Sequence, residues 1–173
     1  CRVLSGKLAT HAHYYSSPVS HVADFSVDDF HDCGVGIATG KTSGLIVLDI
    51  DGAVGLENAA RLQLPPTRSV KTRHGMHLYY AYPQSEQQVP SSPGGLADGI
   101  DVKADDGFVC APPTAHPEGG HYEWVDEDAE IASLSNDTLA HIKRLPHRPI
   151  WKQRRRYLYK KYLRHPLNAL TGI

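Results

Sequence analysis

The spacing of apolar residues predicts a series of short β-strands through the middle of the chain. Residues 45–49 form a run of apolar side chains that ends in acid, which is typical of a buried strand. Residues 69–72 and 77–82 are rich in β-formers on either side of a glycine turn, and this arrangement indicates a hairpin. Further strands are predicted over residues 34–40, 99–103, 108–111 and 121–125, with a turn at residues 105–107 between two of them.

Helical spacing and capping residues predict four helices. The helix over residues 55–64 has its apolar residues on one face and is stopped by Pro65 and Pro66. The others cover residues 26–31, 135–145 and 150–164, and Ser133 or Ser135 caps the second of these. Residues 83–97 are rich in Pro, Ser, Gly and Gln, so we expect an exposed loop, mobile or ordered only by a ligand. Together these elements predict an α+β fold with some α/β mixing and a mostly antiparallel or mixed sheet.

Composition and charge divide the chain into two parts. The chain has 173 residues, 40% hydrophobic and 21% charged, which suits one domain with a tail. Residues 1–142 hold 8 Lys and Arg against 19 Asp and Glu, a formal charge of −11. Residues 143–173 hold 10 Lys and Arg and no acid, a formal charge of +10. We therefore predict a main domain over residues 1–142 and a basic helical tail or linker over residues 143–173, and such asymmetry suggests contact with a polyanion.

Cysteine content and apolar runs bear on the compartment. Cys1, Cys33 and Cys110 form no Cys-x-x-Cys pair, which argues against a disulfide framework and indicates a reducing compartment such as the cytoplasm. No run of about 18 apolar residues is present, so we expect no membrane span. The chain begins with cysteine rather than methionine, and we expect it to be a fragment of a longer protein.

Two aspartates at the end of the buried strand are the first candidates for chemistry. Successive strand side chains point to opposite faces, so Asp49 and Asp51 share one face, while Leu48 and Ile50 point into a core. Two neighbouring carboxylates repel each other, and a divalent cation stabilises such a pair. Taken alone, the pair also fits a strand end that faces solvent above a turn.

A second strand repeats this pattern. Asp101 and Lys103 share one face of the strand over residues 99–103. If this strand lies beside the first, three carboxylates converge, and three carboxylates are what two Mg²⁺ or Mn²⁺ ions need for in-line attack on a phosphate. Taken alone, Asp101 fits a turn acid better than a metal ligand, and Lys103 is also explained as a salt-bridge partner of the acids beside it.

Three motifs in order resemble a known family. The first is a glycine-rich stretch, a Ser-Gly and an apolar strand that ends in Asp-x-Asp; the second is a histidine in a Thr- and Gly-rich turn before an aromatic strand; the third is an Asp strand, a glycine turn and Pro-Pro-Thr. They lie at residues 34–51, at 72–80 and at 100–103 with 107–114, and residues 122–124 close the pattern. The chain resembles, over about residues 30–125, the primase-polymerase domain of the archaeo-eukaryotic primase superfamily, in the bifunctional form of plasmid and phage replication proteins.

The resemblance implies a fold and an activity. It implies a small α/β module packed on a modified RRM-like sheet with the active site in the cleft, so that residues 1–142 are the primase-polymerase catalytic domain. It implies synthesis of DNA from dNTPs on a template, with Mg²⁺ or Mn²⁺ held by Asp49, Asp51 and Asp101. It also implies host-cell cytoplasm as the location if the protein is encoded by a phage or plasmid.

The second motif departs from the family at one position. The family has Ser-x-His, and here the serine is replaced by Gly75. The family's histidine contacts the phosphates of the incoming nucleotide, and this role is carried to His77. Arg73 is a candidate for the missing contact. Lys71, Arg73 and His77 gather cations around one turn, which suits a triphosphate between them and the acids.

Two further sets of residues are candidates for binding. Lys41, Ser43 and Gly44 form a loop that could cradle phosphate, or an ordinary loop, and the P-loop pattern is absent. Lys103 could neutralise phosphate charge. Basic and aromatic residues interleave in the tail, which suits a DNA backbone or a solvated linker helix that leads to a further module such as a helicase. The basic residues predicted to bind DNA are Arg154, Arg155, Arg156, Lys160 and Lys161.

Three functions remain open from the sequence. The first is a DNA polymerase and primase domain that transfers nucleotides from dNTPs, or NTPs, to a 3′-hydroxyl on a DNA template and primer. The second is a replication-initiator module that binds DNA or nucleotide without catalysis. The third is a metal-dependent nuclease, which also uses clustered carboxylates.

Overall fold

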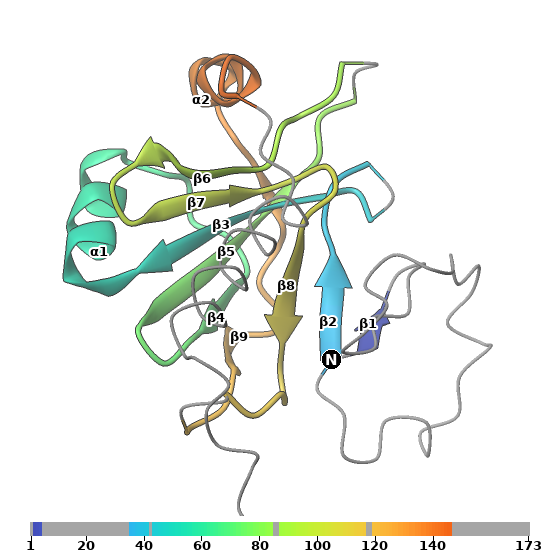
Figure 1. Ribbon diagram of the computed structural model, residues 1–173, viewed down its shortest axis with the longest axis vertical. Coiled ribbons are helices and arrows are strands. Elements are labelled where there is room, and N and C mark those ends of the chain that lie inside the picture. Colours follow the sequence, from blue (N-terminus) through green and yellow to red (C-terminus); the bar gives the residue numbers. More distant parts are fainter. Residues whose placement is uncertain (1, 5–34, 42, 85–86, 117–118, 147–173) are drawn as a thin grey trace, which may run out of the picture.

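Two β-sheets and two helices make up the part of the chain that the computed structural model describes, residues 2–4, 35–41, 43–84, 87–116 and 119–146 (Figure 1). The helices are α1 (Gly52–Arg61) and α2 (Asn136–Lys143). The strands are β1 (Arg2–Leu4), β2 (Val35–Ala38), β3 (Leu45–Asp51), β4 (Ser69–Lys71), β5 (Gly75–Ala81), β6 (Ser92–Ala97), β7 (Ile100–Lys103), β8 (Phe108–Ala111), β9 (Glu123–Asp126) and β10 (Ala132–Ser133). The α+β class expected from the sequence is confirmed.

The large sheet has seven strands and is almost entirely antiparallel. Its order is β6-β7-β3-β5-β4-β9, and β10 pairs with β5 in parallel. The small sheet has the order β1-β2-β8, with β1 parallel and β8 antiparallel to β2. In Figure 1, β2 and β8 run at a steep angle to β3 and β7. The predicted hairpin is confirmed, because β4 and β5 pair in antiparallel register.

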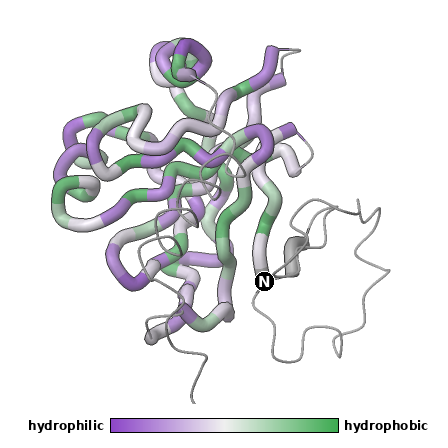
Figure 2. The backbone as a smooth tube through the Cα atoms, in the orientation of Figure 1, coloured by the Kyte–Doolittle hydropathy of each residue, from purple (hydrophilic) through white to green (hydrophobic). Residues whose placement is uncertain are grey.

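Strand β3 lies in the middle of the large sheet because its apolar run can be buried on both faces. Ile46, Leu48 and Ile50 point into a core that is completed by α1 and α2, while Val47 points to the opposite face. All four side chains are fully buried. Figure 2 shows hydrophobic stretches along the strands, with hydrophilic ones both between them and at the turns.

A second core joins the two sheets. Val47 and Tyr79 of the large sheet pack with Val109 of β8, and Ile37 of β2 lies against them. The odd-numbered side chains of β3 all leave on this face, so Asp49 and Asp51 continue the row that Val47 begins. The polar end of β3 therefore lies at the edge of the core between the sheets.

Helix α1 begins three residues earlier than the sequence predicts and ends three residues earlier. It starts directly after β3, at Gly52, whose positive φ of 68° lets the chain turn out of the strand. Its buried Gly55 lies so close to Gly99 that a Cβ would stand 2.4 Å from the Gly99 carbonyl oxygen. The helix ends where Gln63 adopts a positive φ of 48°, before the prolines that the sequence suggests as its stop.

The segment over residues 83–97 corrects the prediction of an exposed loop. Val89 is fully buried in the helix-side core, and residues 92–97 form the edge strand β6 beside β7. The Ser91 side chain donates to the Asp105 carbonyl and accepts from the Ala104 backbone N–H. Proline and glycine are tolerated here because β6 is an edge strand with an irregular register.

Strands β7 and β8 are consecutive in the chain but do not pair. A turn joins them as predicted, with the Gly107 N–H donating to the Ala104 carbonyl at 3.0 Å. However, β7 joins the large sheet and β8 the small one. The turn therefore carries the chain from one sheet to the other, a choice that local turn chemistry does not encode.

The bounds of the remaining elements either agree with the prediction to within a few residues, or the predicted element lies outside the described residues. Strand β9 begins at Glu123, two residues later than predicted, and β1 and β10 were not predicted. Helix α2 is capped by Ser135, whose hydroxyl accepts from the Thr138 N–H at 3.2 Å. The helices predicted over residues 26–31 and 150–164 lie outside the described residues. In the described part of the chain, no helix has the length and apolar character needed to cross a membrane.

Candidate active site

The register of the large sheet brings the predicted carboxylates onto neighbouring strands. Asp49 of β3 stands directly opposite Asp101 of β7 on one side and His77 of β5 on the other. Asp51 is two residues further along β3 and shares the face of Asp49. Strand β7 therefore lies beside β3, which was the condition for the three carboxylates to converge.

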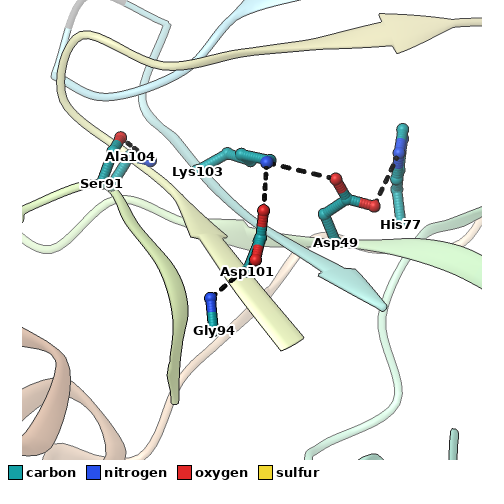
Figure 3. A network of polar contacts seen from close by, with 7 residues as sticks. All are labelled: Asp49, His77, Ser91, Gly94, Asp101, Lys103 and Ala104. Carbon is teal, nitrogen blue, oxygen red and sulfur yellow. Dashed lines mark hydrogen bonds and ion pairs between the residues drawn. The ribbon is translucent and has the colours of Figure 1, made fainter. Parts of the chain in front are cut away.

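Lys103 lies between two of these carboxylates, as Figure 3 shows. Its Nζ is 2.7 Å from Asp101 Oδ2 and 3.3 Å from Asp49 Oδ2. Burial alone would lower the pKa of Lys103, but the charges of Asp49 and Asp101 outweigh burial, so that its pKa is raised. The lysine is therefore held in its charged form.

His77 contacts the other side of Asp49. Its Nε2 is 3.3 Å from Asp49 Oδ1, and only 4% of the residue is exposed. Its Nδ1 is buried and has no hydrogen-bond partner among the described residues. Burial alone would raise the pKa of Asp49, but the hydrogen bond and charge of His77, together with Lys103, leave that pKa lowered. Asp49 is thus ionised and held from two sides.

Asp51 is in a different electrostatic state from Asp49. It is the most exposed of the three carboxylates and forms no ion pair with any described residue. Burial raises its pKa, and the charges of Asp49 and Asp101 raise it further. Lys103 and His77 lower the pKa of Asp51 only in part, so that at the carboxylate edge formed by Asp49, Asp51 and Asp101 this pKa stays raised.

Asp101 is fixed by the segment that the sequence predicts as a loop. The backbone N–H of Gly94, in β6, donates to Asp101 Oδ1 at 2.7 Å (Figure 3). Gly94 has a positive φ of 58°, which glycine adopts without strain. Because Lys103 holds the other oxygen, Asp101 is oriented from both sides. No residue pattern in the sequence indicates the contribution of Gly94.

Gly75 explains the departure from the Ser-x-His motif. A Cβ at this position would stand 1.8 Å from the Ile50 carbonyl oxygen, far inside contact distance. In its place, the Gly75 N–H donates to the Thr72 hydroxyl at 3.0 Å, and Gly75 pairs with Asp51. The close approach of β3 and β5 thus excludes a serine here.

The β4–β5 turn lies beside the end of β3, since the Gly52 N–H donates to the His74 carbonyl at 2.9 Å. Arg73 is exposed on this turn and donates from Nη1 to the Gly119 carbonyl at 2.8 Å. Lys71 is exposed, with Nζ 3.9 Å from Glu123 Oε2. Both cations therefore lie on elements that border the carboxylate edge.

Lys41, Ser43 and Gly44 are not brought to this edge. They precede β3, whereas Asp51 ends it, and seven extended residues span about 20 Å. The Lys41 backbone N–H donates to Asp105 Oδ1 and the Ser43 hydroxyl to the Gly40 carbonyl. Their role with phosphate stays a prediction. The predicted DNA-binding residues of the tail lie outside the described residues.

Two aromatic residues beside the site were not singled out from the sequence. The ring centroid of Tyr122 is 5.6 Å from that of His77. Burial raises the pKa of the Tyr122 hydroxyl, and the negative charges of Asp49 and Asp51 raise it further. The Tyr79 hydroxyl is buried without a partner in the described part of the chain. Tyr79 could have been identified from the sequence, because it is two residues from His77 and therefore lies on the same face of the strand.

The oxygen ligands of the carboxylate edge fit a divalent cation, although Lys103 now lies between two of the three carboxylates. Three carboxylates on one sheet face are the oxygen ligands that Mg²⁺ and Mn²⁺ prefer. The raised pKa of Asp51, caused by burial and by repulsion from Asp49 and Asp101, points the same way. As they stand, no three His, Cys, Asp or Glu side chains among the described residues surround a common point where an ion could sit. The Lys103 ammonium occupies the place between Asp49 and Asp101.

Three acids, a histidine and a lysine thus gather on one face of the large sheet. Residues 8–138 match the family model Prim-Pol, described as bifunctional DNA primase/polymerase, N-terminal. The match covers most of the 173 residues, and the chain belongs to this family. The resemblance found in the sequence is thereby confirmed, and membership places the chain among primases and polymerases, which are nucleotidyltransferases. No curated protein sequence matches the chain.

Proposed function

We propose that this domain transfers nucleotides from dNTPs to the 3′-hydroxyl of a DNA primer on a template and releases pyrophosphate. The observation that carries the proposal is the placement of Asp49 opposite Asp101, with Asp51 on the same face. Membership of the Prim-Pol family supports it. NTPs are the alternative substrate.

The three carboxylates would hold Mg²⁺ or Mn²⁺. Bound ions would lower the pKa of the attacking hydroxyl and neutralise the triphosphate. Before metal and nucleotide bind, the chain's own residues orient the ligands: His77 and Lys103 hold Asp49, while Gly94 and Lys103 hold Asp101. Ligands oriented in this way need little rearrangement when an ion binds.

The cations around the carboxylates would bind the triphosphate. Arg73 lies on the turn that borders Asp51, and its guanidinium suits bidentate contact with phosphate. His77 would contact a phosphate through Nε2, the atom that now faces Asp49. The tail residues Arg154, Arg155, Arg156, Lys160 and Lys161 would bind the DNA backbone, and a helicase or other replication module of the parent chain is a further partner.

Primer extension tests the proposal. The full chain is given a labelled primer on a template, dNTPs and Mn²⁺ or Mg²⁺. We expect Asp49→Asn, Asp51→Asn and Asp101→Asn each to lower the rate by about a hundredfold or more, the scale on which loss of one charge-stabilising group acts. Asp98→Asn is the matched control, because Asp98 is exposed on the turn between β6 and β7.

The same experiment separates the alternatives. Wild-type activity in both Asp49→Asn and Asp51→Asn would overturn the proposal. Salt-dependent DNA binding without incorporation in either metal would point to a binding module. Cleavage of labelled DNA with metal but without dNTPs would point to a nuclease.

A further inference from the structure

Two of the three carboxylates face each other across a strand pair. Asp49 and Asp101 are register partners of β3 and β7, and like charges directly opposite each other in a sheet are destabilising. Neither is fully exposed, so water screens their repulsion only in part. When no metal ion is bound, the pair therefore requires another cation in the folded protein.

Lys103 supplies that cation from the same face of β7. Its Nζ contacts Oδ2 of both aspartates, and the lysine side chain is only 15% exposed (Figure 3). The remaining oxygens face other partners, since Asp49 Oδ1 faces His77 and Asp101 Oδ1 accepts from Gly94. Among the described residues, Lys103 is therefore the partner of the two Oδ2 atoms, which are the oxygens of Asp49 and Asp101 that no other group holds.

We propose that Lys103 is a built-in counter-ion that holds Asp49 and Asp101 in position without metal and is displaced when a divalent cation binds. The inference rests on the proposed function for the identity of the metal-binding carboxylates. Lysine suits this exchange because its ammonium sits on a flexible four-carbon stem and can leave without moving the backbone. Arginine, with a planar fork, would hold the carboxylates more rigidly.

The exchange has a consequence for the order of events. While Lys103 bridges the two aspartates, its ammonium is paired with their carboxylates. Once Lys103 is displaced, its ammonium can pair with a second anion beside the same site. Lys103 and the metal ion thus compete for the carboxylates of Asp49 and Asp101. In the proposed reaction, the phosphates of the nucleotide are the anion that the displaced Lys103 would bind. Metal binding thereby prepares the cation that the triphosphate uses.

Mn²⁺ binding to the full chain tests the competition. The free ion is measured by electron paramagnetic resonance in wild type, Lys103→Met and Arg61→Met. We expect Lys103→Met to bind Mn²⁺ about tenfold more tightly or better, because a charge-assisted bond no longer competes. Arg61→Met is the matched control for net charge, because Arg61 lies near the end of α1, is exposed and pairs with Glu57 at 2.6 Å. Unchanged or weaker binding in Lys103→Met would overturn the inference.

A second measurement uses the wild-type chain, so folding of a variant does not enter. Lysines are acetylated with a reactive ester with and without Mn²⁺, and the rate at each lysine is followed by mass spectrometry. We expect Mn²⁺ to raise the rate at Lys103 several-fold and to leave Lys71 unchanged, because displacement exposes the Lys103 amine. A rate at Lys103 that stays constant or falls contradicts displacement.

Neither measurement depends on catalysis. A chain that exchanges Lys103 for Mn²⁺ but incorporates no dNTP loses the proposed function and keeps the inference. A chain that extends primers without any change at Lys103 keeps the proposed function and loses the inference.

Discussion

At the scale of single residues, contacts between backbones decide what the motif can contain. Gly75 stands where the family has serine, and the Ile50 carbonyl leaves no room for a side chain. The second motif of this chain therefore presents His77 without a neighbouring hydroxyl from position 75. The Thr72 hydroxyl, which accepts from the Gly75 N–H, lies on the same turn.

We predict that Gly75→Ala lowers the free energy of unfolding by about 3 kcal/mol, because overlap forces the backbones of β3 and β5 apart. Gly44→Ala is the control: Gly44 has a positive φ of 70° but open space around it. Its expected cost is about 1–2 kcal/mol, the strain of a left-handed backbone alone. Urea unfolding of both variants gives the comparison, and a smaller loss in Gly75→Ala than in Gly44→Ala would contradict the overlap.

At the scale of elements, the segment before β7 is part of the site's support. Val89 anchors it in the core, and the Val89 N–H donates to Asp105 Oδ2 at 2.8 Å. From this anchor the chain continues into β6, which carries Gly94 to Asp101. Composition alone suggested a loop, because the serine, glycine and proline of this segment give no sign that Val89 is buried or that residues 92–97 pair with β7.

We predict that Val89→Ala lowers the free energy of unfolding by about 2 kcal/mol, as expected for a buried aliphatic side chain. Gln88→Ala, at the exposed neighbouring position, is expected to change it by less than about 0.5 kcal/mol. Thermal or urea unfolding measures both. Equal stability of the two variants would show that the segment behaves as the loop that its composition suggests.

At the scale of the whole molecule, the charges of the two parts of the chain have opposite signs. Residues 1–142 carry a formal charge of −11 and residues 143–173 one of +10. The carboxylate edge belongs to the acidic part and would repel DNA unless cations are supplied nearby. The basic residues of the tail are one source of such cations.

We predict that replacing Arg154, Arg155 and Arg156 together by alanine weakens DNA binding and lowers its dependence on salt. Three lost phosphate contacts reduce the slope of log affinity against log salt concentration by about 2–3. Arg61→Ala is the control, because Arg61 on α1 is paired with Glu57 at 2.6 Å. An unchanged slope would indicate the alternative, a solvated linker.

Features that depend on neighbours along the chain could be predicted from the amino-acid order alone. Asp49 and Asp51 share a face because strand side chains alternate, and Asp101 shares a face with Lys103 for the same reason. The apolar run of β3 predicted a buried strand, and the motif order predicted the family.

The folded sheet, by contrast, establishes which strands are neighbours. It placed β7 rather than β8 beside β3, put Lys103 between two aspartates and brought Gly94 to Asp101. The contacts of Asp49 with Lys103 and Asp101 join residues far apart in sequence, and the packing of the whole sheet fixes them, not local backbone preference. The carboxylates and the contact of Lys103 with Asp101 could be named from the sequence, whereas the second contact of Lys103, with Asp49, depends on the register between strands.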